Sequence, residues 1–134
     1  MDEQLCYCNS KQLYSICCKP FITHQKKPET ALKLMRSRYT AFCLKDASYI
    51  KSTMKGRALQ FYDEDSICNS PIKWLGLTIV DSEDGQDGDD QGTVTFQALF
   101  KNHDDDPEVS FIEEKSVFKY SDNQWFYVDL VPNS

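Results

Sequence analysis

The 134-residue sequence lacks the features of a membrane or secreted protein. No apolar run approaches the ~20 residues that a transmembrane helix needs. The N-terminus has no basic segment followed by a long apolar stretch, so we expect no secretory signal and a cytoplasmic location. Histidine is scarce, with two residues in the whole chain, and neither lies near the polar strand motifs described below, which disfavours catalysis. The length fits one domain of ordinary size.

Positive charge is scarce in the second half of the chain. Residues 1–59 carry 11 Lys and Arg against 4 Asp and Glu, whereas residues 60–134 carry 4 against 17. The net charge of -6 argues against nonspecific binding of nucleic acid across the whole surface. The basic first half leaves room for a local contact with an anionic partner, although a solvated face is the simpler interpretation.

Cysteine has the most informative placement. Four of the six cysteines fall within thirteen residues, in the pattern C-x-C-x8-C-C: Cys6, Cys8, Cys17 and Cys18. Adjacent cysteines are poor disulfide partners, and a chain of this length needs no disulfide framework. Four clustered thiolates suit Zn²⁺, and a closed tetrahedral shell makes the site structural. A redox-active or merely reduced thiol cluster is the alternative, and His24 is a substitute ligand.

The segment between the two cysteine pairs can bring them together. Residues 9–11 favour a turn, because Asn tolerates left-handed backbone geometry. Residues 12–16 can form one helical turn that returns the second pair to the metal. Chelation would then hold together a segment too short to have its own core.

The middle of the chain has helical periodicity. Apolar residues recur at three- and four-residue steps over 29–45, which predicts a helix that includes Cys43 as a buried residue. Asp46 can cap a second, short helix over 47–51. Residues 19–28 are predicted to be a polar linker, and Cys68 is predicted to lie in a loop.

The second half is predicted to form four antiparallel strands, at about 73–81, 94–100, 109–120 and 124–131. The acidic stretch 81–92 does not fit an EF-hand and is predicted to be a long, solvated hairpin connection. Helices followed by a run of strands indicate an α+β fold in which helices cover one face of a curved sheet.

Several motifs resemble those of a known family. The first four cysteines are similar to the SEC-C motif, a short zinc-binding module. Met35 to Phe42, Trp74 to Leu77, Glu114-x-Ser116-x-Phe118 and Trp125-x-Tyr127-x-Asp129 resemble the signatures of the YchJ-like family of small bacterial proteins. The resemblance implies an NTF2-like (cystatin-like) cone over residues 28–134, preceded by a zinc knuckle and linker over residues 1–27.

Such a cone can enclose a pocket. The side chains expected to project into it come from the helix and from the strands: Arg38, Tyr39, Trp74, Glu114, Ser116, Trp125, Tyr127 and Asp129. An enzyme would use Asp129 or Glu114 as a base and Arg38 as an electrophile. The alternative, which we favour, is a buried Arg–carboxylate network that holds helix to sheet. We therefore assign no catalytic residue. Arg36 lies two residues from Arg38 and cannot face the same way.

Two functions follow from these features. The favoured one is a zinc-stabilised interaction module that contacts an acidic protein surface or ribosome-associated RNA. The alternative is a small-molecule-binding or enzymatic NTF2-like domain, which a cone filled by Trp74, Phe96 and Phe118 would disfavour. The fold also makes a homodimer through the sheet a reasonable expectation.

Overall fold

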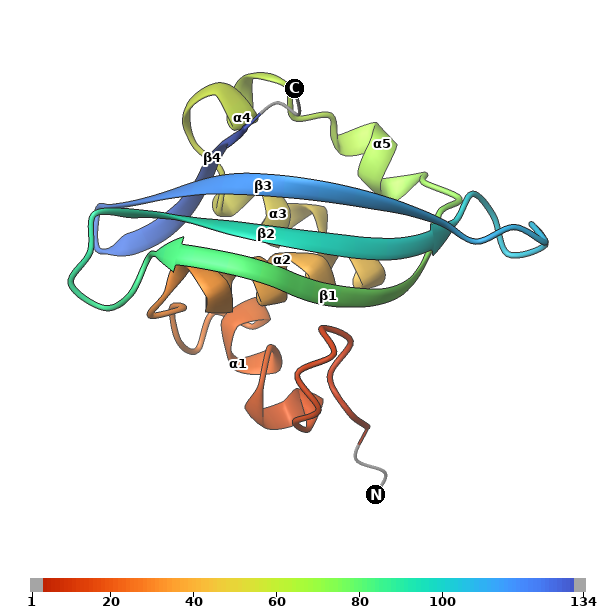
Figure 1. The fold of residues 1–134 in the computed structure, drawn as a ribbon, viewed down its shortest axis with the longest axis horizontal. Helices are drawn as coiled ribbons and strands as arrows, with labels where there is room; N and C mark the ends of the chain where they lie inside the picture. Colours follow the sequence, from red (N-terminus) through yellow and green to blue (C-terminus); the bar gives the residue numbers. More distant parts are fainter. Residues whose placement is uncertain (1–3, 132–134) are drawn as a thin grey trace.

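The computed structural model describes residues 4–131 and places a layer of helices on one face of a four-stranded sheet (Figure 1). The helical elements are η1 (Tyr14–Ile16), α1 (Lys19–Ile22), α2 (Ala31–Leu44), α3 (Ala47–Ser52), α4 (Gly56–Gln60) and α5 (Glu64–Cys68). The strands are β1 (Lys73–Asp84), β2 (Gln91–Lys101), β3 (Ser110–Ser121) and β4 (Gln124–Val131). The sheet is antiparallel in the order β1-β2-β3-β4, which confirms the predicted α+β architecture. Within residues 4–131, no helix has both the length and the apolar character that crossing a membrane requires.

Helix α2 forms the centre of the helical layer. Its N-cap is Thr30, whose Oγ1 accepts a hydrogen bond from the Lys33 amide at 3.1 Å. The helix therefore begins slightly later than predicted, because the capping hydroxyl satisfies an amide that has no intrahelical partner. Its buried face includes Leu34 and Tyr39 and packs on β1, β2 and β4. Asp46 caps α3 as predicted, since its Oδ1 accepts from the Tyr49 amide at 3.1 Å.

Two predictions for irregular segments are wrong. Residues 19–22 form α1 instead of a polar linker, and its Phe21 and Ile22 are buried in a small cluster with α3. Burial of this apolar pair outweighs the polar composition of its neighbours. Cys68 is the last residue of α5 and not part of a loop, and its side chain is exposed.

The β1–β2 hairpin is tighter than predicted. The ladder continues to Asp84 and resumes at Gln91, so the acidic residues before the turn extend an edge strand. Gly85 adopts φ +74 and is buried, and its carbonyl accepts a hydrogen bond from the Ala31 amide at 2.9 Å. A Cβ at Gly85 would lie 2.7 Å from the Ala31 Cβ, so glycine allows the turn to dock on the start of α2.

Bulges curve the sheet. The register shifts on either side of Leu75 and Val80 in β1, and again at Val128 in β4. Each extra residue bends its strand and increases the local twist. The inward-facing side chains and α2 enclose the main core, which includes Leu77, Phe118 and Trp125.

Candidate metal centre and sheet pocket

The four clustered cysteines converge on one point. Their Sγ atoms all lie within 4.8 Å of one another, and Cys17 Sγ lies 3.6 Å from Cys8 Sγ and 3.9 Å from Cys18 Sγ. A tetrahedron with metal–sulfur bonds of about 2.3 Å has sulfur–sulfur edges of about 3.8 Å. The four sulfur atoms therefore fit a tetrahedral metal ion. None of the six cysteines forms a disulfide, and the exposed His24 is not part of the group.

The intervening turn has the predicted geometry. Asn9 and Lys11 adopt φ 64 and φ 71, and the Cys6 amide donates to the Gln12 carbonyl at 2.8 Å. The helical turn η1 then leads the chain back to Cys17. We call residues 4–22 the cysteine module.

The cysteine module is fixed to the rest of the molecule through α2 and β1. Arg36 Nη1 donates to the Cys8 carbonyl at 2.6 Å, and Asn9 Nδ2 donates to the Leu77 carbonyl at 3.0 Å. Cys8 is fully buried and belongs to the same hydrophobic cluster as Trp125. The module therefore shares the core of the main domain and is not a separate appendage.

The thiols polarise one another. Hydrogen bonds from Cys18 and Cys6 hold the pKa of Cys8 well below its usual range, whereas hydrogen bonds with Cys6 and Cys8 raise the pKa of Cys18. Burial raises the pKa of Cys17 to about 11. Ser10 Oγ lies 3.1 Å from Cys17 Sγ and can donate to it. These shifts favour a thiolate at Cys8 and neutral thiols at Cys17 and Cys18, and a bound cation would stabilise the thiolate form at all three positions.

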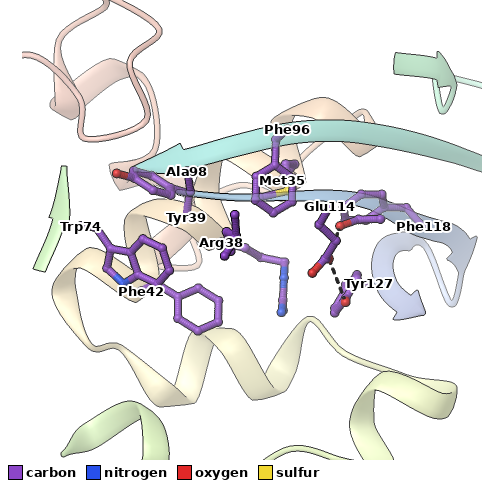
Figure 2. Close-up of a pocket in the computed structure, with 12 residues that line it drawn as sticks. Met35, Arg38, Tyr39, Phe42, Trp74, Phe96, Ala98, Glu114, Phe118 and Tyr127 are labelled. Carbon is purple, nitrogen blue, oxygen red and sulfur yellow. Dashed lines mark hydrogen bonds between the residues drawn. The ribbon is translucent and has the colours of Figure 1, made fainter. Parts of the chain in front are cut away.

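A cavity of about 250 Å³ lies between α2 and the inward face of the sheet (Figure 2). Six of the eight predicted pocket residues line it: Arg38, Tyr39, Trp74, Glu114, Ser116 and Tyr127. Phe96 and Phe118 line its walls without filling it. The possibility that aromatic side chains occupy the whole cone is therefore excluded.

The other two predicted residues lie outside the cavity. Trp125 is buried beside the start of α2, where its Nε1 donates to the Glu29 carbonyl at 3.1 Å. Asp129 pairs with Val117 because the bulge at Val128 interrupts the alternation that Trp125 and Tyr127 begin. Its carboxylate instead lies 3.7 Å from Arg57 Nε on the surface.

Polar groups gather at one end of the cavity. Glu114 Oε2 accepts hydrogen bonds from Ser116 Oγ at 2.6 Å and from the Tyr127 hydroxyl at 3.1 Å. Burial and the nearby Glu114 carboxylate raise the pKa of Tyr127, so this hydroxyl remains a donor at neutral pH. Figure 2 shows Glu114 and Tyr127 facing each other across this end of the cavity.

Arg38 connects this polar end to the helical layer. Its Nη1 donates to the Ile50 carbonyl at 2.8 Å and to Thr53 Oγ1 at 2.7 Å, and its guanidinium carbon lies 4.7 Å from the centre of the Tyr127 ring. Burial lowers the pKa of Arg38 to about 10, so the group remains charged at neutral pH. Arg38 forms no ion pair with a carboxylate in residues 4–131, so the predicted Arg–carboxylate network is wrong. The contact of Arg38 with the sheet is instead a cation–π interaction with Tyr127.

The opposite end of the cavity is aromatic. The Trp74 ring lies 6.1 Å from Tyr39 and 6.3 Å from Phe42, both in edge-to-face geometry. Phe42 was not predicted as a pocket residue, although its place one turn after Tyr39 on the apolar stripe of α2 was a usable signal. Ile112 lies at the rim, where 40% of its surface is exposed.

Comparisons with known proteins agree with this structure. A family model described as the YchJ middle NTF2-like domain matches residues 30–130. UPF0225 protein SG1365 of Sodalis glossinidius is 39% identical over 92% of this chain and 80% of its own length. UPF0225 protein Ent638_2310 of Enterobacter sp. (strain 638) is 38% identical, over 94% of this chain and 82% of its own.

Two solved structures are similar over nearly the whole chain. The solution structure of RPA3114, a SEC-C motif containing protein from Rhodopseudomonas palustris, has a TM-score of 0.85 at 27% identity, covering 98% of this chain and 100% of that one. The crystal structure of a SEC-C motif containing protein from Psychrobacter arcticus has a TM-score of 0.77 at 27% identity, covering 98% and 85%. These findings confirm the resemblance drawn from the sequence motifs: the chain belongs to the YchJ-like (UPF0225) family, and its main domain has the NTF2-like fold.

Proposed function

We propose that the cysteine module binds one structural zinc ion and docks on an acidic protein surface in the cytoplasm. The observation that carries the proposal is the convergence of four Sγ atoms within 4.8 Å. Zinc prefers this soft, tetrahedral ligand set, and four thiolates leave no open position for water or substrate. Both structural relatives are described as SEC-C motif containing proteins, which supports the same assignment.

The outer surface of the module supports a role in docking. Leu5 and Ile16 are 59% and 68% exposed, and Lys11 and Lys19 are exposed in the same segment. Exposed apolar side chains beside positive charge suit a partner with an acidic, partly apolar surface. The metal would hold this short segment in one conformation, which reduces the entropy lost on binding.

The test compares partner recovery by wild type with recovery by the Lys11→Glu plus Lys19→Glu variant, which leaves all four thiols in place. The matched control, Lys51→Glu plus Lys119→Glu, makes the same charge change at exposed positions outside the module. We expect recovery of a protein partner to fall only in the module variant. Equal recovery from both variants would contradict docking through the module, and recovery that nuclease abolishes would identify RNA as the partner.

The cavity favours a second candidate function, small-molecule binding. Its supporting observation is a preformed cavity of about 250 Å³ with aromatic walls and polar groups at one end. Ile112→Trp should block the rim, whereas Phe111→Trp places the same side chain at the neighbouring residue, which faces the other side of the sheet. A thermal-shift screen of aromatic fragments should give stabilisation that the first variant loses and the second keeps.

A further inference from the structure

We propose that the cavity binds a neutral, planar bicyclic aromatic ligand whose ring N–H donates a hydrogen bond to Glu114 Oε1. This inference rests on the second candidate function, small-molecule binding in the cavity. It goes further by naming the class of ligand and the atom that selects it.

The size and walls of the cavity set the shape of the ligand. At about 30 Å³ per molecule, a volume of about 250 Å³ corresponds to roughly eight waters, which matches one bicyclic ring system. Tyr39, Phe42 and Trp74 provide edges and faces at one end, and Phe96 provides a wall from β2. Aromatic rings favour this environment through offset and edge-to-face contacts.

The polar end of the cavity favours a ligand that carries a hydrogen-bond donor. Glu114 Oε2 already accepts from Ser116 and Tyr127, whereas Oε1 accepts no hydrogen bond from residues 4–131. In residues 4–131, every side-chain nitrogen or oxygen atom that is shielded from solvent has a hydrogen-bond partner. Oε1 has none, so it must be accessible to solvent or to a ligand. It is an open acceptor on a residue that lines the cavity, and a ligand N–H would satisfy it.

The charges at this end favour a neutral ligand. The carboxylate of Glu114 and the guanidinium of Arg38 both line the cavity, so it presents one negative and one positive group to a ligand. A ligand ammonium attracted to Glu114 would also be repelled by Arg38, and a ligand carboxylate attracted to Arg38 would also be repelled by Glu114. A neutral N–H group avoids both penalties and gains a hydrogen bond to a charged acceptor.

The experiment uses indole and benzofuran, which share one bicyclic shape and differ in having a ring N–H or a ring oxygen. Each is titrated into the full-length, isotope-labelled, zinc-supplemented protein, and affinities are read from NMR shifts. We expect indole to bind about tenfold or more tightly than benzofuran, with shifts concentrated at residues that line the cavity. Glu114→Gln should remove most of this preference, because it replaces the charged acceptor by a neutral amide.

The control variant is Glu113→Gln, whose residue lies next in sequence and bonds Gln97 on the opposite face of the sheet. It should keep the preference for indole, and Ile112→Trp should weaken binding of both probes. Equal binding of the two probes would overturn the role of Glu114 while leaving the cavity as a ligand site. Binding of neither probe to wild type would overturn the inference, whereas the second candidate function stands or falls with the thermal-shift screen of fragments. A preference unchanged in Glu114→Gln would also overturn the inference.

Discussion

Chelation of the proposed zinc ion should destabilise the whole domain and not only the cysteine module. Cys8 and Cys18 belong to the same buried cluster as Trp125, and Arg36 ties the module to α2. With free zinc at 1,000 times its dissociation constant, binding stabilises the folded state by about 4 kcal/mol. For a chain of this length, each kcal/mol corresponds to roughly 4 °C in Tm. We therefore expect chelation to lower Tm by roughly 15 °C.

The assay is thermal unfolding followed by tryptophan fluorescence, because Trp74 and Trp125 both lie in the main domain. Cys18→Ser should lose the response to zinc, whereas Cys68→Ser, which alters an exposed thiol on α5, should keep it. A tryptophan transition that is the same with zinc and with chelator would refute the reasoning. It would mean that the module and the domain unfold independently, despite their shared core.

Three further predictions concern residues outside the metal site. Trp125→Phe removes the hydrogen bond to the Glu29 carbonyl and should cost about 1 kcal/mol of unfolding free energy in urea titrations, whereas an unchanged midpoint would contradict that bond. Asp129→Asn should change the free energy of unfolding by less than about 0.5 kcal/mol, because the ion pair of Asp129 with Arg57 is exposed to solvent. A larger loss in the same titration would contradict the surface position of this carboxylate. Burial raises the pKa of the Cys43 thiol from 9.0 to about 11, so its contribution is complete below pH 9 and is lost as pH rises toward 11. After allowance for solvent screening, wild type should lose about 1 to 2 kcal/mol more than Cys43→Ala over that range, and parallel pH profiles would show that this thiol does not titrate with folding.

Local patterns predicted the elements whose signals lie within a few residues. The apolar stripe that includes Tyr39 predicted α2, the side chain of Asp46 predicted the start of α3, and alternation predicted β3. The four cysteines were also predictable as a group, because their spacing and their shared chemistry are visible in the chain. The division between residues 27 and 28 and the pairing of two chains through the sheet stay predictions.

Features that depend on register or on distant partners were not predictable. A single bulge at Val128 removes Asp129 from the face of Tyr127, and alternation alone cannot show an inserted residue. Trp125 has the same pattern as a pocket residue, but its partner is a carbonyl at the start of α2, 96 residues away. In α1, two apolar residues in a polar segment gave too weak a periodic signal to indicate burial.

The most direct test of the central claim is the zinc content of protein purified without chelator or affinity metal, measured together with a thiol titration. A closed four-thiolate site predicts about one zinc per chain. It also predicts that Cys6, Cys8, Cys17 and Cys18 react only after the metal is stripped. Protein that contains no zinc, with all six thiols reacting freely, would contradict the account and would make the cluster a redox-active or merely reduced set of thiols.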